Sequence, residues 1–216
     1  MKNILSVGIT LALFLSGLQA CEKTSNNWSD SALSNAEKQS LAFMREEEKM
    51  AYDVYGKMDQ KWGIIPFQNI KQSEWTHMGA VKTLLDRYGL TDPAAGKAAG
   101  EFSNTVIQQL YYNLVEKGDS SELQALIVGA NIEEIDIRDL KEQLLSVTHL
   151  DLKQVYENLM RGSRNHLRAF VSNLALRGYT YWPQYLSQQE FNEIINSPME
   201  KGGMNRGGQG RNFNPL

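Results

Sequence analysis

The stretch Ser-Glu-Trp-Thr-His places the carboxylate of Glu74 three positions before the imidazole of His77. Residues at this spacing are neighbours on one face of a helix, so both side chains can bind one ion. The apolar stripe of the predicted helix is formed by Ile70, Val81, Leu84, Leu85 and Tyr88. At about 100° per residue, Glu74 and His77 fall near the centre of this stripe. A buried carboxylate without a partner is costly, so we expect either a metal ion or a buried His–Glu hydrogen bond to compensate it.

A second group of acids lies in the segment REEEKMAYDVY. The apolar positions around it place Glu47 nearest the centre of the helical stripe and Glu48 on its flank. Glu46, Lys49 and Asp53 face away from the stripe. A solvated charge run explains Glu46 well. It explains Glu47 and Glu48 less well, so one of these two is predicted to point into a site.

The segment IEEIDIRDL carries the third group of acids. Glu133 and Glu134 flank the centre of the apolar stripe on opposite sides, and Asp136 lies farther off, beyond Glu133. Periodicity does not choose between the two glutamates. The alternative is that both lie at the edge of the stripe and form ion pairs with Arg or Lys.

The segment MRGSRNHLRAF supplies a second candidate histidine. Ser163 lies near the centre of the inward-facing stripe, and His166 lies toward one side of it. A single histidine at such a position is most often a hydrogen-bonded core residue. Its coincidence with acids on three other helices favours a metal ligand. His149, in the loop before this helix, is predicted to be exposed.

Carboxylates and imidazoles together suit iron or manganese, and a carboxylate can bridge two such ions. In helical bundles with two metals, Glu comes from two helices and Glu-x-x-His from the other two. The order here is Glu, Glu-x-x-His, Glu and then a histidine.

These residues fall on six predicted helices, four long and two shorter. Their ranges are about 35–60, 70–88, 103–117, 121–145, 152–177 and 188–196. Ser34 and Glu37 form a capping-box pattern at the first start. Pro66 is predicted to keep the chain non-helical at Ile65, so that the second helix begins only after Asn69.

The pattern predicts an all-α fold. The first two long helices, and the last two, have short connections, whereas about thirty residues with a short helix separate the two pairs. This arrangement predicts a ferritin-like four-helix bundle with one long crossover. An up-down bundle with an inserted helix would give the same pattern.

The ends of the chain have a different character. Residues 1–20 contain Lys2 followed by an apolar stretch too short for a comfortable membrane span, which is typical of a signal peptide. Leu-Gln-Ala-Cys, ending at Cys21, resembles the lipobox of bacterial lipoproteins. That resemblance implies cleavage before Cys21, its lipidation, and a membrane-anchored protein of the bacterial cell envelope; export as a soluble protein is the alternative. We expect a polar tether over 21–33, one domain over 34–198 and a disordered Gly- and Asn-rich tail over 199–216.

EKMAYDVY is similar to the first-helix motif of bacterioferritins, a ligand Glu followed seven residues later by Tyr. This resemblance favours Glu48 over Glu47 and suggests that Tyr55 hydrogen-bonds a ligand carboxylate, although an ordinary packed tyrosine fits equally.

Four segments together resemble an uncharacterised prokaryotic family of ferritin-like proteins: REEEKMAYDVY, SEWTH, GANIEEIDIRDL and GSRNHLRAF. The resemblance covers about residues 38–196, and Ser163 departs from it, because a complete second Glu-x-x-His would have Glu there. The metal ligands it implies are Glu48, Glu74, His77, Glu133 or Glu134, and His166. The missing carboxylate would be replaced by Glu47, by Asp136, or by whichever of Glu133 and Glu134 is not already a ligand.

Three functions are compatible with these residues: a metal-dependent oxidoreductase acting with oxygen or peroxide, a non-catalytic metal-binding lipoprotein, and a metal-free structural or interaction module. The formal charge of −3, with acids and bases mixed along the chain, gives no indication of nucleic-acid binding. A closed storage cage is disfavoured by the anchor and the tail. A homodimer is compatible with the sequence.

Overall fold

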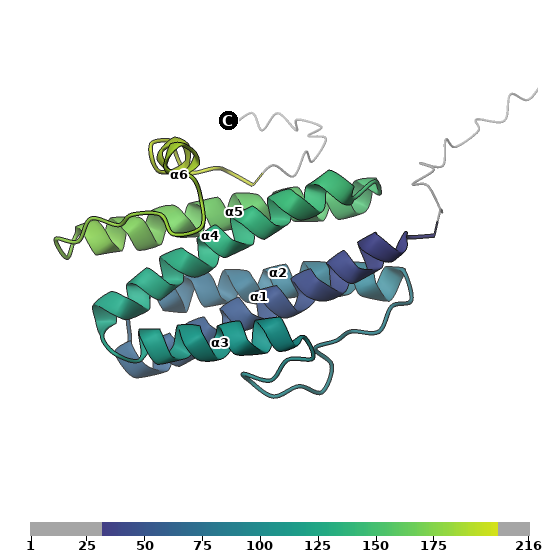
Figure 1. The fold of residues 1–216 in the computed structure, drawn as a ribbon, viewed down its shortest axis with the longest axis horizontal. Helices are drawn as coiled ribbons and strands as arrows, with labels where there is room; N and C mark the ends of the chain where they lie inside the picture. The colour runs from purple at the N-terminus through teal and green to yellow at the C-terminus, as the bar shows by residue number, and fades with distance from the viewer. Residues whose placement is uncertain (1–31, 203–216) are drawn as a thin grey trace, which may run out of the picture.

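The computed structural model describes residues 32–202 as six α-helices, with no β-strand in that range (Figure 1). The helices are α1 (Asn35–Trp62), α2 (Ile65–Arg87), α3 (Thr105–Gly118), α4 (Glu122–Ser146), α5 (Leu150–Ala175) and α6 (Gln188–Ile195). The all-α prediction is therefore confirmed. The predicted signal peptide, Cys21, most of the tether and most of the tail lie outside the described residues. None of the described helices is both long and apolar enough to cross a membrane.

Five helices agree closely with their predicted ranges, and the capping box at the start of α1 is present. The start of α2 was predicted wrongly. Gly63, at φ 61°, ends α1, and α2 begins two residues later with Pro66 in its first turn. A proline there loses nothing, because the first turn of a helix has no intrahelical acceptor for its N–H groups.

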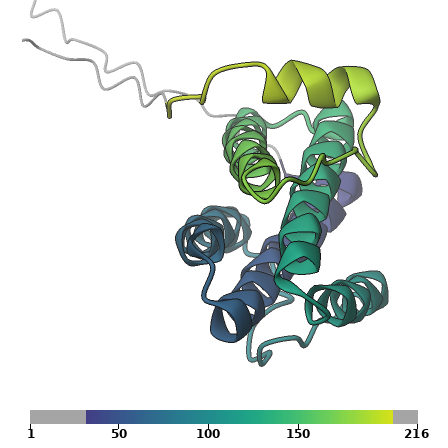
Figure 2. The same cartoon turned by 90° about the vertical axis from the view of Figure 1, so that its left-hand side faces the viewer.

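The four long helices form a closed set of neighbours. Contacts join α1 to α2, α2 to α5, α5 to α4 and α4 to α1. The helix α3 packs on α1 and α4, and it returns the chain so that α2 and α4 run in the same direction (Figure 1). The short α6 crosses the outer side of the α4–α5 pair (Figure 2).

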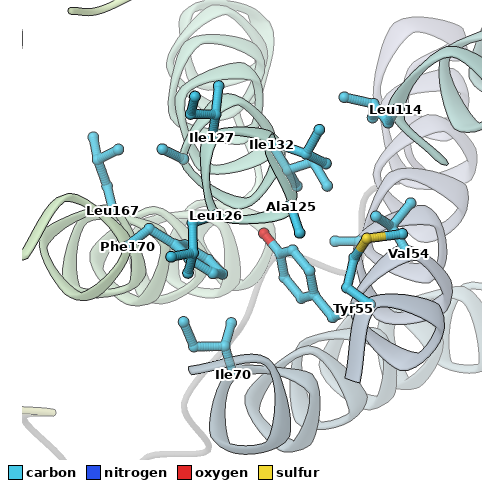
Figure 3. Packing of buried hydrophobic residues seen from close by; sticks show 14 of the residues in the cluster. Val54, Tyr55, Ile70, Leu114, Ala125, Leu126, Ile127, Ile132, Leu167 and Phe170 are labelled. Carbon is cyan, nitrogen blue, oxygen red and sulfur yellow. The ribbon is translucent and has the colours of Figure 1, made fainter. Parts of the chain in front are cut away.

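The apolar core consists of two clusters, one toward each end of the bundle. Figure 3 shows part of the first cluster, in which Tyr55 lies among Ile70, Leu126 and Phe170. On α1 the chain passes from the second cluster at Met44 to the first at Met50. The intervening residues, and their counterparts on the other three long helices, are the polar ones singled out above. A band of buried polar side chains thus crosses the bundle between two apolar clusters.

The expectation that the outward-facing acids of α1 are solvated was wrong. Glu46, Lys49 and Asp53 are all buried, because the connection between α2 and α3 covers their face of α1. Glu46 accepts hydrogen bonds from the backbone N–H groups of Ser103 and Asn104. Lys49 Nζ donates to the Ala98 carbonyl, and Asp53 Oδ2 accepts from the Gly100 N–H. These charges therefore pin a long connection to the bundle.

Candidate metal centre

Glu74 lies at the middle of the polar band, and its two carboxylate oxygens face two histidines on different helices. Oε2 lies 2.8 Å from Nδ1 of His77 on the same helix, and Oε1 lies 2.9 Å from Nδ1 of His166 on α5. The two imidazole rings are stacked, with centroids 5.6 Å apart and an interplanar angle of 26°. A single carboxylate therefore contacts two imidazoles, and the contact with His166 joins α2 to α5.

One further glutamate stands beside each histidine. Oε2 of Glu48, on α1, lies 3.3 Å from His77 Nδ1, and Oε2 of Glu133, on α4, lies 3.4 Å from His166 Nδ1. The result is two groups, each of two carboxylates and one imidazole, that share Glu74. In each group one ligand atom from every residue lies within 4.8 Å of the others, which is close enough to surround one ion. Each of the four long helices contributes at least one of the five side chains.

The charges at this centre are held away from water. The three glutamates are at most 2% exposed. Burial, and then repulsion from Asp136, raise the pKa of Glu48 well above its usual value. Burial also raises the pKa of Glu133, and His166 offsets this only in part. Glu74 differs, because the charges of the two histidines outweigh its burial and hold its pKa well below the usual range.

The histidines show the reciprocal effect. Burial alone would lower the pKa of His77, but the charges of Glu74 and Glu48 raise it well above its ordinary value. Glu133 and Glu74 likewise outweigh burial and raise the pKa of His166 to about 10. The raised pKa values favour protonated imidazoles between these carboxylates in the metal-free chain. A bound cation would replace those protons, since a metal ligand must be deprotonated.

Hydrogen bonding alone leaves atoms of this centre unsatisfied. His77 Nδ1 and Glu74 Oε2 form a hydrogen bond at 2.8 Å. In contrast, Glu48 Oε1 is buried without a hydrogen-bond partner, and Glu74 Oε1 and His166 Nδ1, although 2.9 Å apart, are not aligned for a hydrogen bond with each other. Buried polar atoms normally have a partner, and carboxylate and imidazole atoms converging in this way are donors that iron and manganese accept. The two groups of buried side chains could therefore hold metal ions.

A model of an uncharacterised protein domain, DUF2202, matches residues 37–198. The chain belongs to the DUF2202 family. It is 52% identical over 174 residues to the uncharacterised protein MJ0754 of Methanocaldococcus jannaschii, a match that covers 81% of this chain and 94% of that protein. The crystal structure of the hypothetical protein MJ0754 from Methanococcus jannaschii superposes with a TM-score of 0.77 at 51% identity, covering 79% of this chain and 97% of the other. This relative thus has the same fold and about half of its residues in common with this chain.

Tyr55 holds one carboxylate of the candidate centre in the DUF2202 domain. It is fully buried, and its hydroxyl donates a hydrogen bond of 2.5 Å to Glu133 Oε1. This contact holds one oxygen of Glu133 and leaves the other, Oε2, facing His166. Burial, and then the charge of Glu133, raise the pKa of the Tyr55 hydroxyl well above its usual value, so the group remains a donor.

The remaining predicted residues lie near the two groups or turn away from them. The Ser163 hydroxyl lies within hydrogen-bond distance of Asp136 Oδ2 and of the Leu159 carbonyl oxygen. Glu47 Oε2 and Asp136 Oδ1 are buried without hydrogen-bond partners, but neither residue belongs to a three-residue group. Glu134 points toward the segment before α6, where its Oε2 accepts hydrogen bonds from three successive backbone N–H groups. These belong to Gln184, Tyr185 and Leu186.

The prediction that His149 is exposed was wrong. It is 7% exposed, and its Nδ1 lies 2.8 Å from Glu37 Oε1. Glu37 also accepts hydrogen bonds from the backbone N–H and the hydroxyl of Thr148. Glu37, the second member of the capping box of α1, thus also binds the chain at the start of α5. The sequence contains the capping pattern, but it gives no indication of this second, distant partner.

Proposed function

We propose that the domain binds two divalent transition-metal ions, iron or manganese, on a ferritin-like four-helix bundle. The observation that carries the proposal is the position of Glu74, whose two oxygens face two histidines on opposite sides. Glu48, Glu74 and His77 would hold one ion, and Glu74, Glu133 and His166 the other. Three carboxylates would carry a charge of −3 against +4 from two divalent ions, so the site is nearly neutral when filled.

The helix arrangement supports the ferritin-like assignment. α2 and α4 run in the same direction because α3 carries the chain back along the bundle, as a single long crossover requires (Figure 1). The position of Ser163 is the main difference from a complete two-metal site of this kind, because its hydroxyl binds Asp136 in place of a second shared carboxylate. Each ion would then have three protein ligands and would keep open positions for small molecules.

We infer that the filled site is an oxidoreductase centre of the cell envelope. Bound iron or manganese would supply one-electron redox chemistry toward oxygen or peroxide. With ferrous iron as the reductant, two one-electron oxidations balance the reduction of one peroxide and two protons to two waters. The chain's own part is to neutralise the ions with buried glutamates, to fix Glu133 through Tyr55, and to exclude bulk water from the centre.

A non-catalytic metal-binding protein is the second candidate. The observation that favours it is Ser163, which leaves the two ions one shared carboxylate instead of two. The cavity of about 680 Å³ is lined by Ile137, Met160 and Arg164 among others, and by none of the five proposed ligands. The proposed centre therefore lies outside that cavity.

The decisive experiment is a metal count. The full chain, purified in detergent, is loaded anaerobically with ferrous iron or with manganese, desalted and analysed for metal per chain. We expect about two ions, and loss of both in Glu74→Gln. Glu134→Gln is the matched control, because it changes a neighbouring buried glutamate that lies outside both groups and should retain two ions. No retained metal in the folded wild-type chain would refute the proposal, and metal without oxygen or peroxide consumption would favour the non-catalytic candidate.

We also propose that the chain is exported and anchored to the membrane through lipidated Cys21. Mass spectrometry of the membrane fraction should show a chain that begins at residue 21 and carries added acyl mass. Cys21→Ala should release the protein from membranes. A wild-type chain that is soluble after export would support ordinary cleavage near Ala20 instead.

A further inference from the structure

Gly162 lies in the middle of α5, where glycine is an unfavourable choice. Glycine in a helix interior costs about 1 kcal/mol relative to alanine. The backbone does not require it, because the glycines with positive φ among residues 32–202 are Gly63, Gly89, Gly96, Gly100 and Gly178. The structure offers a different reason for a glycine at 162, which is the lack of space for a side chain.

The space beside Gly162 is filled by the ring of His77. A Cβ atom at position 162 would lie 2.7 Å from both Cε1 and Nε2 of His77, and 3.9 Å from Cε1 of His166. The first distance is too short for two carbon atoms, whereas the second is an ordinary van der Waals contact. A methyl group at 162 would therefore displace the His77 ring and leave His166 in place.

The displaced edge of His77 adjoins the atom that faces the glutamates, because Cε1 is bonded to Nδ1. Cε1 and Nε2 lie against Gly162, while Nδ1 lies 2.8 Å from Glu74 and 3.3 Å from Glu48. Because the ring is attached through two rotatable bonds, a push at Nε2 moves it by torsion and carries Nδ1 with it. The helices can keep their places, so the geometry of the ligand changes before the fold does.

We propose that Gly162 is a positioning residue, which seats His77 so that Nδ1 faces Glu48 and Glu74. The part of this proposal that concerns metal rests on the proposed function. The part that concerns packing does not, and it can be measured in the metal-free chain. A glycine on α5 thus sets the position of a ligand on α2.

The test is a double-mutant cycle on the full chain with Gly162→Ala, His77→Ala and the double variant. In metal-free protein, Gly162→Ala should lower the melting temperature by about 2–6 °C, because the methyl group displaces a buried ring. In the His77→Ala background the same change should raise it, because the methyl group enters vacated space and alanine favours the helix. Gly79→Ala is the matched control: Gly79 lies inside α2 with no atom within 4 Å of its added Cβ, so this variant should be neutral or stabilised.

Metal binding gives the second measurement. Gly162→Ala should lose about one of the two ions, or bind it at least tenfold more weakly, whereas Gly79→Ala should retain both. The positioning role of Gly162 is refuted if Gly162→Ala changes the melting temperature equally in the wild-type and His77→Ala backgrounds. It is also refuted if Gly162→Ala keeps the wild-type metal count and affinity. If Gly162→Ala does not fold, folding of the double variant with His77→Ala supports the positioning role. Failure of both Gly162→Ala and the double variant to fold overturns it. A wild-type chain that binds no metal would refute the proposed function. The double-mutant cycle on the metal-free chain would still test whether Gly162 positions His77.

Discussion

Replacing Tyr55 with phenylalanine isolates one hydrogen bond to a proposed ligand. The change removes the hydroxyl that donates to Glu133 Oε1 at 2.5 Å and leaves the ring in its fully buried place. A hydrogen bond to a charged group contributes about 1.5–3 kcal/mol. For a chain of this length about 2–4 °C corresponds to each kcal/mol. We therefore expect the melting temperature of the metal-free chain to fall by about 3–12 °C.

The same variant should weaken metal binding in one half of the centre. Loss of a group that orients a ligand typically costs about 10–100-fold in metal affinity. Because Glu133 belongs to the group with His166, we expect one of the two ions to bind more weakly and the other to keep its affinity. Competition titrations with a chromophoric chelator would resolve the two binding steps, and thermal unfolding of the metal-free protein would measure stability separately.

Tyr156→Phe provides the matched control. Tyr156 is also fully buried, and its hydroxyl shares a hydrogen bond of 2.8 Å with Ser40, at the other end of the bundle and away from both groups. A neutral hydrogen bond contributes about 0.5–1.5 kcal/mol, so this variant should lose stability but keep the affinity for both ions. Equal metal affinities in wild type, Tyr55→Phe and Tyr156→Phe would refute the role assigned to Tyr55.

Three further predictions follow from individual contacts. Glu134→Ala removes the acceptor for three backbone N–H groups and should lower the melting temperature by about 4–12 °C while leaving the metal count at two, which thermal unfolding and elemental analysis would check. Ser163→Glu should destabilise the metal-free chain, because it buries another carboxylate beside Asp136. On adding metal, its melting temperature should rise more than that of wild type. A rise no larger than that of wild type, in melting curves with and without metal, would mean that residue 163 lies away from the ions. Hydrogen bonds from Arg164 are the main cause that lowers the pKa of Glu200 to about 2. The ionised Glu200 therefore contributes stability that is complete above its unfolded pKa near 4.5 and is lost as the pH falls toward 2. The free energy of unfolding, measured with urea between pH 2 and 6, should depend less on pH in Glu200→Gln.

The predictions that depended on one helix at a time were close to the structure. Capping residues, glycine stops and apolar periodicity gave five of the six helices nearly their observed limits. The exception, α2, shows the limit of a local rule, since Pro66 disfavours helix before it but fits well within a first turn. Glu74 and His77 share a helix face by their spacing alone, so their closeness needed no tertiary information.

Adjacent glutamates could not be distinguished in this way. Successive residues on a helix point about 100° apart; on a wide apolar stripe this favoured Glu47 over Glu48 and left Glu133 and Glu134 undecided. Neighbouring elements decide between them. Glu48 faces His77 from α1, and Glu133 faces His166 from α4, while Glu134 is taken up by the backbone of the segment before α6.

The sequence by itself determined the helices, the pairing of Glu74 with His77 and the presence of a histidine on the fourth long helix. Only the tertiary structure decided which acids meet, because that depends on side chains from four helices that are far apart along the chain. It also decided the burial of His149 and of the charged face of α1, which are covered by chain that no local pattern can place. The role of Gly162 belongs to the same class, since the atoms that require a glycine there belong to another helix.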